Sequence, residues 1–182
     1  MARNLRPLQQ YSEHDVINFF AYSGDSTLVR KGTAVKVQGA GFQADSTNPV
    51  EMLGNPGASY TNTVSQRYGA VPKVAAAVSG DKVIGFTLLD IRETDENGEK
   101  LVYNPRKAAE MNVVISGQAV PVLTRGVVLY SGLAAGSAGD NVYLHSGTAG
   151  DLTTTNHGGN TKVGKLLGDR DANGVALLKI EL

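Results

Sequence analysis

The clearest spacing for metal chemistry lies near the C-terminus, where residues 169–174 read DRDANG. This run matches the start of an EF-hand calcium loop, in which oxygens at alternate positions bind the ion and a glycine makes the sharp turn. The twelfth position of such a loop should be a bidentate glutamate, but here it is Ile180. The residues after Gly174 also have the pattern of a strand rather than of a helix. We therefore predict a hairpin turn and no metal site.

A second run, GNTKVGKL at residues 159–166, imitates the phosphate-binding loop G-x-x-x-x-G-K. That loop needs a serine or threonine after its lysine to bind magnesium, and this chain has Leu166 there. The strand–loop–helix context is also missing, and the segment that starts at Lys162 fits a strand better. The sequence therefore predicts no nucleotide cofactor.

A nucleophile set can be assembled on paper from His145, Ser146 and Asp151. No G-x-S-x-G elbow supports this set, and the other two histidines, His14 and His157, lie far away in the sequence. His145 ends a predicted strand and His157 sits in a turn, so both are expected to be exposed turn residues. We predict that the chain is not an enzyme and has no catalytic, cofactor-binding or metal-binding residues.

The composition argues against further classes of partner. The 182 residues carry 17 basic and 17 acidic side chains without a long basic run, so we expect no nucleic-acid partner. Cysteine is absent, which excludes disulfides and cysteine-based zinc sites. No apolar run is long enough to cross a membrane, and the N-terminal stretch MARNLRPLQQ lacks the apolar region of a secretory signal. The sequence therefore predicts no membrane association.

Short strands dominate the closing segment, residues 120–182. Apolar runs of about four to eight residues recur there between Gly, Asn, Asp or Ser. They predict strands at 127–130, 142–144, 162–167 and 175–182.

Two details of the closing hairpin can be predicted. Asn173 and Gly174 lie between the last two strands, and this dipeptide is typical of a type I′ turn, which needs positive φ at both central residues. In the final strand Leu178, Ile180 and Leu182 can share one face, with Lys179 and Glu181 on the other, because side chains alternate between the two faces of a strand.

The first half shows weaker patterns. Residues 12–22 favour a strand because β-branched and aromatic residues dominate, although Ser12 and Asp15 also have the spacing of a helix capping box. Asn104 as N-cap and Pro105 at the first helical position predict one short helix. Further strands are predicted at 28–38, 74–78, 82–91, 101–103, 113–115 and 120–123.

Two stretches of the chain look alike. Residues 82–98, with KVIG followed by ETDENG, resemble residues 162–174, with KVG followed by DRDANG, and residues 32–37 resemble 139–144. We interpret the similarity as an internal duplication, and chance likeness between short glycine-rich strands is the alternative. The predicted fold class is all-β, with small antiparallel barrel or sandwich units, an extended N-terminal arm and at most one short helix.

The predicted boundaries follow from this duplication. Residues 1–15 form the arm, residues 16–115 the first β unit and residues 116–182 the second. The first unit carries a long loop insertion at 39–72, which is rich in Gly, Asn, Ser, Thr and Pro. A frayed terminus is the alternative for the arm, but its apolar residues would be unusual in a purely solvated tail.

The closing module resembles the capsid decoration, or cement, proteins of tailed bacteriophages. The resemblance covers about the last third of the chain, and the first half matches only through the proposed repeat. It rests on turn-and-strand motifs, namely VPV at 120–122, GV at 126–127, AGDNVYL at 138–144, GDLT at 150–153, NTKVG at 160–164 and the final strand from 174 to 182.

This resemblance implies a structural virion protein that binds the outer surface of the assembled capsid and stabilises it by clamping neighbouring major capsid protein subunits. It also implies a homotrimer at local threefold positions, with synthesis in the host cytoplasm. An arm that orders on binding could reach a neighbouring capsid subunit. The predicted partner contacts are therefore Arg3, Leu5, Arg6, Pro7, Leu8 and Tyr11.

Two alternatives come from other functional classes. A β-sandwich adhesion or carbohydrate-binding module would present an aromatic platform, yet tryptophan is absent and the tyrosines are scattered. A small hydrolase would need a clustered acid–base set with perturbed pKa values, which the sequence does not display.

Overall fold

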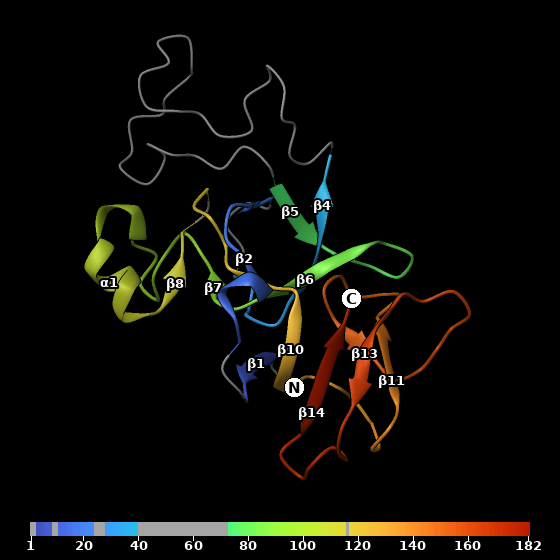
Figure 1. Cartoon of the computed structure of the whole chain (residues 1–182). Helices are drawn as coiled ribbons and strands as arrows, with labels where there is room; N and C mark the ends of the chain where they lie inside the picture. Colours follow the sequence, from blue (N-terminus) through green and yellow to red (C-terminus); the bar gives the residue numbers. More distant parts are fainter. Residues whose placement is uncertain (1–2, 9–10, 24–27, 40–72, 116) are drawn as a thin grey trace.

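The fold of the described residues is almost entirely β. A computed structural model describes residues 3–8, 11–23, 28–39, 73–115 and 117–182. Among these residues it contains two six-stranded sheets, one two-stranded sheet and one short α-helix (Figure 1). The predicted all-β fold class is therefore confirmed. The predicted loop at 39–72 lies outside the described residues, apart from Gly39.

Sheet A joins the N-terminal strand to the closing segment. Its strand order is β1-β10-β14-β13-β11-β12, and all neighbouring strands are antiparallel. The four strands predicted after residue 120 are confirmed, with small shifts in their bounds. The strands of sheet A are β1 (Asn4–Pro7), β10 (Arg125–Ser131), β11 (Asn141–Leu144), β12 (Leu152–Thr153), β13 (Lys162–Leu166) and β14 (Val175–Glu181).

Sheet B is built mainly from strands of the first half of the chain and curls into a small barrel. Its strand order is β2-β9-β6-β4-β5-β3. Both β2 and β3 belong to the segment 16–22, which pairs with β9 at one edge of the sheet and with β5 at the other. This segment therefore closes the sheet. The strands are β2 (Val16–Ile17), β3 (Ala21–Tyr22), β4 (Ala34–Gln38), β5 (Lys73–Ala76), β6 (Val83–Thr87) and β9 (Val122–Leu123).

The two sheets share one hydrophobic core. Alternation along β4 sends Val35 into the interior of the barrel, whereas Ala34 faces sheet A. The side chains of Phe86 and Leu123 also lie between sheet B and sheet A, in a buried cluster that includes Leu178. The two sheets therefore pack against each other through a common core and do not form separate lobes.

The sheets repeat one local topology, which supports the interpretation of an internal duplication. In chain order, β4, β5, β6 and β9 occupy sheet B as β9-β6-β4-β5, and β11, β12, β13 and β14 occupy sheet A as β14-β13-β11-β12. A register shift interrupts the β4–β6 pair between Val35 and Lys36, and another interrupts the β11–β13 pair between Val142 and Tyr143. The sequence repeat thus coincides with equivalent strands and equivalent bulges.

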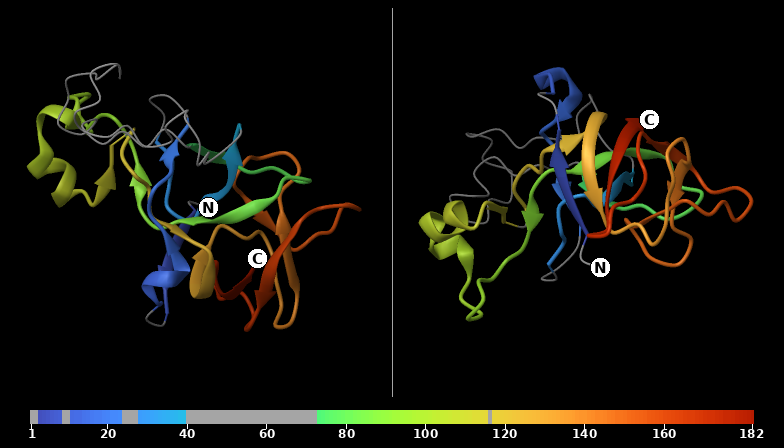
Figure 2. Two further views of the ribbon diagram at one scale, coloured as in Figure 1. Left: turned by 45° about the horizontal axis from the view of Figure 1, so that its top comes forward. Right: turned by 90° about the horizontal axis from the view of Figure 1, so that it is seen from below.

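A helical knob, residues 92–115, projects from sheet B. In Figures 1 and 2 its α-helix lies on the side of the molecule away from β11, β13 and β14. The predicted helix is confirmed as α1 (Pro105–Glu110), with the Asn104 side chain accepting a hydrogen bond from Lys107 N. The parallel pair of β7 (Asp90–Ile91) and β8 (Val113–Val114) joins the knob to the barrel.

The prediction of a strand at 101–103 is wrong. These residues form a 3₁₀ helix, Leu101–Tyr103, in which Leu101 O accepts a hydrogen bond from Asn104 N at 3.0 Å. The turn buries Leu101 against Ala108 in a small core, whereas a short strand here would need a neighbouring strand along its length. It also leaves the Tyr103 side chain 80% exposed.

The prediction of a type I′ turn is also wrong. Positive φ occurs at Gly174 but not at Asn173, and residues 167–174 form a longer connection between β13 and β14. Asp171 shapes the turn: its carbonyl accepts from Gly174 N at 3.0 Å and its carboxylate accepts from Val175 N at 2.7 Å. Leu182, which follows the last paired residue of β14, is 50% exposed.

Residues 12–22 combine the two readings of their sequence. Ser12 and Asp15 form a capping box around the 3₁₀ helix Glu13–Asp15, with both reciprocal hydrogen bonds present. The β-branched and aromatic residues that follow form β2 and β3, so the favoured strand prediction is correct for only part of the segment.

Candidate functional site

The predicted partner contacts lie on or beside β1, an edge strand of sheet A. β1 pairs with β10 from Asn4↔Ser131 to Pro7↔Val128. Alternation along β1 buries the Leu5 side chain, which is 1% exposed, in the shared core. The segment is extended, but it is integrated into the sheet. Leu5 therefore acts as an anchor for β1 and is inaccessible to a partner in this conformation.

Arg3 ties the beginning of β1 to both β units. Its Nε donates to Asp151 Oδ1 at 2.6 Å, and its Nη1 donates to Thr33 Oγ1 at 2.5 Å. Gly150 lies between these partners and has positive φ, and a Cβ atom there would collide with the Thr33 methyl group. The same glycine bonds through its carbonyl to Ala34 N at 3.1 Å. Arg3 is therefore engaged within the fold.

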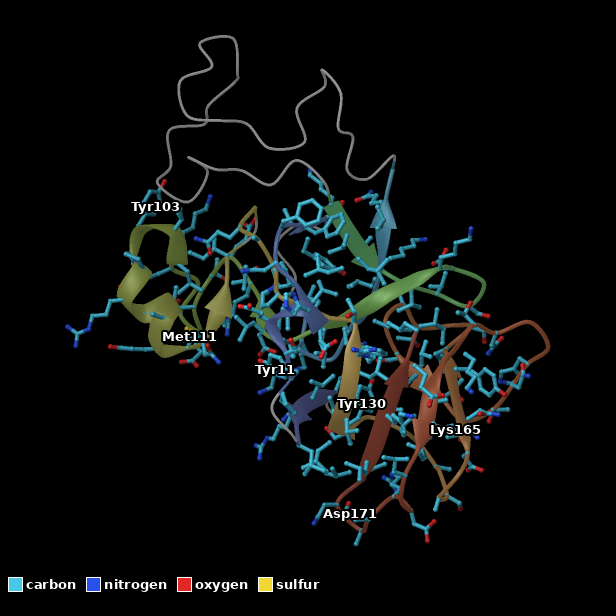
Figure 3. The ribbon with its side chains drawn as sticks, viewed as in Figure 1. Tyr11, Tyr103, Met111, Tyr130, Lys165 and Asp171 are labelled. Atoms are coloured by element: carbon cyan, nitrogen blue, oxygen red, sulfur yellow. The ribbon has the colours of Figure 1, made fainter. Side chains whose placement is uncertain are left out.

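The exposed part of the predicted set forms a patch at the end of β1. The side chains of Leu8 and Tyr11 are 51% and 42% exposed, and Arg6 and Pro7 are exposed as well. Leu8 N donates to Val127 O at 3.1 Å, which continues the β1–β10 ladder. Figure 3 shows Tyr11 beside β1 and β2. We call Arg6, Pro7, Leu8 and Tyr11 the N-terminal patch.

A groove of about 200 Å³ opens beside this patch. Its walls include Pro7, Tyr11, Leu123, Gly126 and Val127. The wall opposite β10 is held by Asp15, whose carbonyl accepts from Thr124 N at 2.8 Å and whose carboxylate pairs with Arg125 at 3.2 Å. The N-terminal patch thus borders a small recess that has both polar and apolar surface, with Asp15 holding one of its walls in place.

A larger, mainly polar cavity of about 360 Å³ lies at the other end of β1. Arg3, Tyr22, Thr33 and Asp151 line it, and burial raises the pKa of the Tyr22 hydroxyl. Its polar groups largely satisfy one another, because Arg3 bonds to Asp151 and Thr33, and Thr33 Oγ1 in turn donates to Arg30 O at 2.6 Å. This arrangement is a structural corner that connects the sheets.

The nucleophile set does not assemble. His145 Nδ1 accepts hydrogen bonds from the backbone of Gly147 and Thr148, each at 3.0 Å, which assigns it to a turn. His145 N does donate to the Asp151 carbonyl at 2.8 Å, but the Asp151 carboxylate bonds to Arg3 and not to the imidazole. The two side chains therefore lack the orientation of a catalytic pair.

Possible metal sites and membrane spans were considered for the described residues. Within that part of the chain, no group of three His, Cys, Asp or Glu side chains could hold a metal ion. None of the helices described is long and apolar enough to cross a membrane. The DRDANG run forms the turn described above, with the Asp171 carboxylate bonded to Val175 N.

Sequence reasoning missed the buried ion pair that holds the helical knob together. Asp95 is 4% exposed; its Oδ1 accepts from Asn97 N and Glu99 N at 2.8 Å each, and its Oδ2 pairs with Lys107. The Lys107 ammonium lowers the pKa of the Asp95 carboxyl, with help from the two backbone donors. Asp95 precedes Asn97-Gly98 in the turn, and this spacing is typical of an Asx turn. The spacing could have predicted that the Asp95 carboxylate bonds to the backbone.

Comparison with known proteins identifies the family. A family described as "Structural cement protein (E217 gp24/Pam3 gp6)" of phages matches residues 10–182. The match covers the barrel, the helical knob and sheet A apart from β1. No curated protein and no solved structure matches the chain significantly. The family and the resemblance seen in the closing module agree, and the chain belongs to the phage structural cement proteins, which are parts of the virion capsid.

Proposed function

We propose that this protein binds the outer surface of the assembled capsid and stabilises it by clamping neighbouring major capsid protein subunits. The observation that carries the proposal is the family match, which extends over both β units rather than over one short motif. A non-enzymatic role is part of the proposal, and the engagement of Asp151 by Arg3 instead of His145 supports it.

Stabilisation would arise from linkage between binding and assembly. A ligand that binds the assembled shell but not the dissociated subunits stabilises the shell by mass action. Many copies on equivalent sites of one shell add their contributions. A protein whose two β units share one core is suited to this role, because a stiff body that contacts two capsid subunits resists their separation.

The proposed clamp uses the N-terminal patch. Its members Arg6, Pro7, Leu8 and Tyr11 are exposed and lie on or beside the groove, so they can contact a capsid subunit without unfolding of β1. Arg3 and Leu5 would contribute indirectly by holding β1 in place. We also propose a homotrimer, in which three patches bind neighbouring subunits together and gain avidity.

Sedimentation tests the proposal directly. The purified protein is centrifuged alone and with cement-free shells assembled from the cognate major capsid protein. Saturable binding at a fixed ratio to capsid subunits is expected, together with a higher melting temperature of the decorated shells. The mass of the free protein by analytical ultracentrifugation tests the trimer. A folded protein that ignores the shells would refute the proposal and direct attention to the adhesion-module alternative, for which a glycan array is the screen.

A further inference from the structure

The outward face of sheet A combines an exposed apolar row with a basic rim. Leu129 on β10 pairs with Leu177 on β14, and Leu167 N donates to Leu177 O at 2.8 Å, so three leucines lie side by side across the strands. Their neighbours Val128 and Leu178 point to the buried face, as alternation requires. Leu167 is 49% exposed, and Leu129 and Leu177 are partly exposed. The row is therefore accessible to a partner.

Basic side chains surround this leucine row. Arg6 on β1 pairs in register with Leu129, and Lys165 on β13 pairs with Lys179 on β14 (Lys165 is labelled in Figure 3). Lys162 is exposed at the start of β13. We call these four basic residues, together with Leu129, Leu177 and Leu167, the basic face.

Little negative charge offsets this rim within the fold. Glu181 pairs with Lys179 at 2.9 Å and with Lys162 at 3.6 Å, so one carboxylate serves two ammonium groups. Arg6 and Lys165 make no ion pair with any described residue. The whole chain, by contrast, has equal numbers of acidic and basic side chains. The basic face is thus a local excess of positive charge on a neutral protein.

Lys165 and Lys179 lie directly opposite each other on neighbouring antiparallel strands. Like charges directly opposite each other on neighbouring antiparallel strands are destabilising by a few tenths of a kcal/mol up to about 1 kcal/mol. Acidic residues occur in the flanking loops, but their carboxylates accept backbone hydrogen bonds: Asp140 from Ser137 N and Asp169 from Ala138 N, both at 2.8 Å. The fold therefore leaves the Lys165 ammonium group available to an external carboxylate, whereas Lys179 is already paired with Glu181.

We infer that the basic face docks on an acidic, partly apolar surface of the major capsid protein. The inference rests on the proposed function and adds the face of the molecule and the chemistry of its partner. The leucine row would bury apolar area, while Arg6, Lys162 and Lys165 would pair with capsid carboxylates around it, an arrangement typical of protein interfaces. Arg6 and Leu8 make the basic face continuous with the N-terminal patch, because Leu8 continues the ladder to Val127.

Other occupants fit this face less well. A second copy facing the same surface would place lysines against lysines, and like-charge contacts at an interface cost several kcal/mol. A nucleic-acid backbone would pair with the basic rim but would leave the leucine row without an apolar partner. An acidic protein surface satisfies both features of the basic face.

The test uses charge reversal with a matched control. The variant Arg6→Glu/Lys165→Glu changes two exposed residues of the basic face, and Lys100→Glu/Arg106→Glu makes the same change in net charge on the helical knob. Affinity for cement-free shells is measured by cosedimentation at low salt and in about 1 M salt, where the Debye length is roughly 3 Å. Far-UV circular dichroism and thermal unfolding establish that each variant is folded.

The basic-face variant should bind the shells at least about tenfold more weakly at low salt, while the knob variant binds like the parent. High salt should narrow the difference between the parent and the basic-face variant. The conservative variant Arg6→Lys/Lys165→Arg should keep parental affinity. If the double reversal prevented folding, the milder single variant Lys165→Ala would replace it, with an expected loss of about threefold or more.

Several results would overturn the inference. Equal affinity of the basic-face variant and the parent for the shells would show that this face does not touch the shell. If the basic-face variant and the knob variant lost the same affinity, the cause would be the net charge of the protein and not this face. If the basic-face variant had a different oligomeric mass from the parent in the absence of shells, the face would be assigned to self-association. If the parent bound duplex DNA and the basic-face variant did not, the face would be assigned to nucleic-acid binding. Failure of the parent protein to bind shells would refute the proposed function itself and the inference with it.

Discussion

Arg3 and Asp151 are 148 positions apart in the sequence, yet Arg3 Nε donates to Asp151 Oδ1 at 2.6 Å. The same guanidinium reaches Thr33 in the turn before β4. The contact therefore connects the N-terminal strand, the first β unit and the second β unit at one point. Because the Asp151 carboxylate bonds to Arg3, it does not pair with His145. Asp151 therefore has a structural role here and not the catalytic role that its place near His145 in the sequence could have suggested.

Replacing Arg3 by Ala or Asp151 by Asn should each lower the free energy of unfolding by about 1–2 kcal/mol, because a partly buried, charge-assisted hydrogen bond is lost. The double variant should lose less than the sum of the two singles, with a coupling of about 0.5–2 kcal/mol. Urea denaturation measures all three values. Arg6→Ala on the same strand is the control and should stay within about 0.5 kcal/mol of the parent. Strict additivity would mean that the contact contributes nothing in solution.

Leu5 and Leu8 separate anchoring of β1 from partner binding. Leu5→Ala should destabilise the protein by about 2–4 kcal/mol, because it leaves a cavity in the shared core. Leu8→Ala should change stability by less than about 0.5 kcal/mol, since that side chain is half exposed, but should weaken binding to shells. Denaturation and cosedimentation of both variants provide the comparison. Unchanged shell affinity of Leu8→Ala would remove Leu8 from the proposed clamp.

Gly85 and Gly164 occupy equivalent places in the two sheets, opposite Val35 and Val142 beside the register shifts. A Cβ atom at Gly164 would collide with the Lys179 carbonyl oxygen, and one at Gly85 would collide with that of Leu123. Either Gly→Ala variant should cost about 1–3 kcal/mol, because the neighbouring strand must move.

Gly168→Ala is the matched control for this pair. Among the described residues, no atom outside the immediate neighbours of Gly168 lies within 4 Å of a Cβ atom placed there, and the φ of Gly168 is outside the left-handed region. The change should therefore be neutral or slightly stabilising. Thermal unfolding of the three variants measures the difference. Equal melting temperatures for all three would contradict the close approach of the strands.

The helical knob should loosen in acid. Lys107 lowers the pKa of Asp95 in the folded protein below the ordinary aspartate value of about 4. A carboxyl group with a depressed folded pKa contributes stability that is present above the unfolded pKa and is lost as the pH falls through the folded pKa. The contribution of Asp95 should thus be constant from pH 7 to about pH 5 and decline below about pH 4.

Asp95→Asn provides the control for that prediction. Its melting temperature should be lower than that of the parent at pH 7, and the difference should shrink in acid, because the parent loses the ion pair by protonation. Amide hydrogen exchange in α1 reports the knob itself. A difference between the two proteins that is independent of pH would exclude the ion pair as its cause.

Much of the local structure follows from the sequence because it depends on neighbouring residues. Alternation in 175–182 predicts which side chains of β14 are buried, and Asn104 with Pro105 predicts the start of α1, since both are short-range effects. Residues 101–103 show the limit of such patterns, because three apolar residues fit a strand or a 3₁₀ turn equally well until a packing partner, here Ala108, selects one.

Long-range pairing could not be predicted in this way. The edge position of β1, its pairing with β10 and the contact between Arg3 and Asp151 depend on which segments meet, and nothing within a short window encodes the partner. The basic face is a further example, since Arg6, Lys165 and Lys179 are isolated charges in the sequence and come to one face of sheet A only through strand register.

The sequence alone thus determined the all-β class, the repeated strand motifs and the resemblance to cement proteins, because these depend on alternation, turn residues and local motifs. Tertiary structure decided that the two units share one core, that β1 completes sheet A, and that basic and apolar side chains converge on its outward face. The reason is that the backbone edge of a strand can form hydrogen bonds with many different strands. Only the burial of the whole core selects one set of strand pairs.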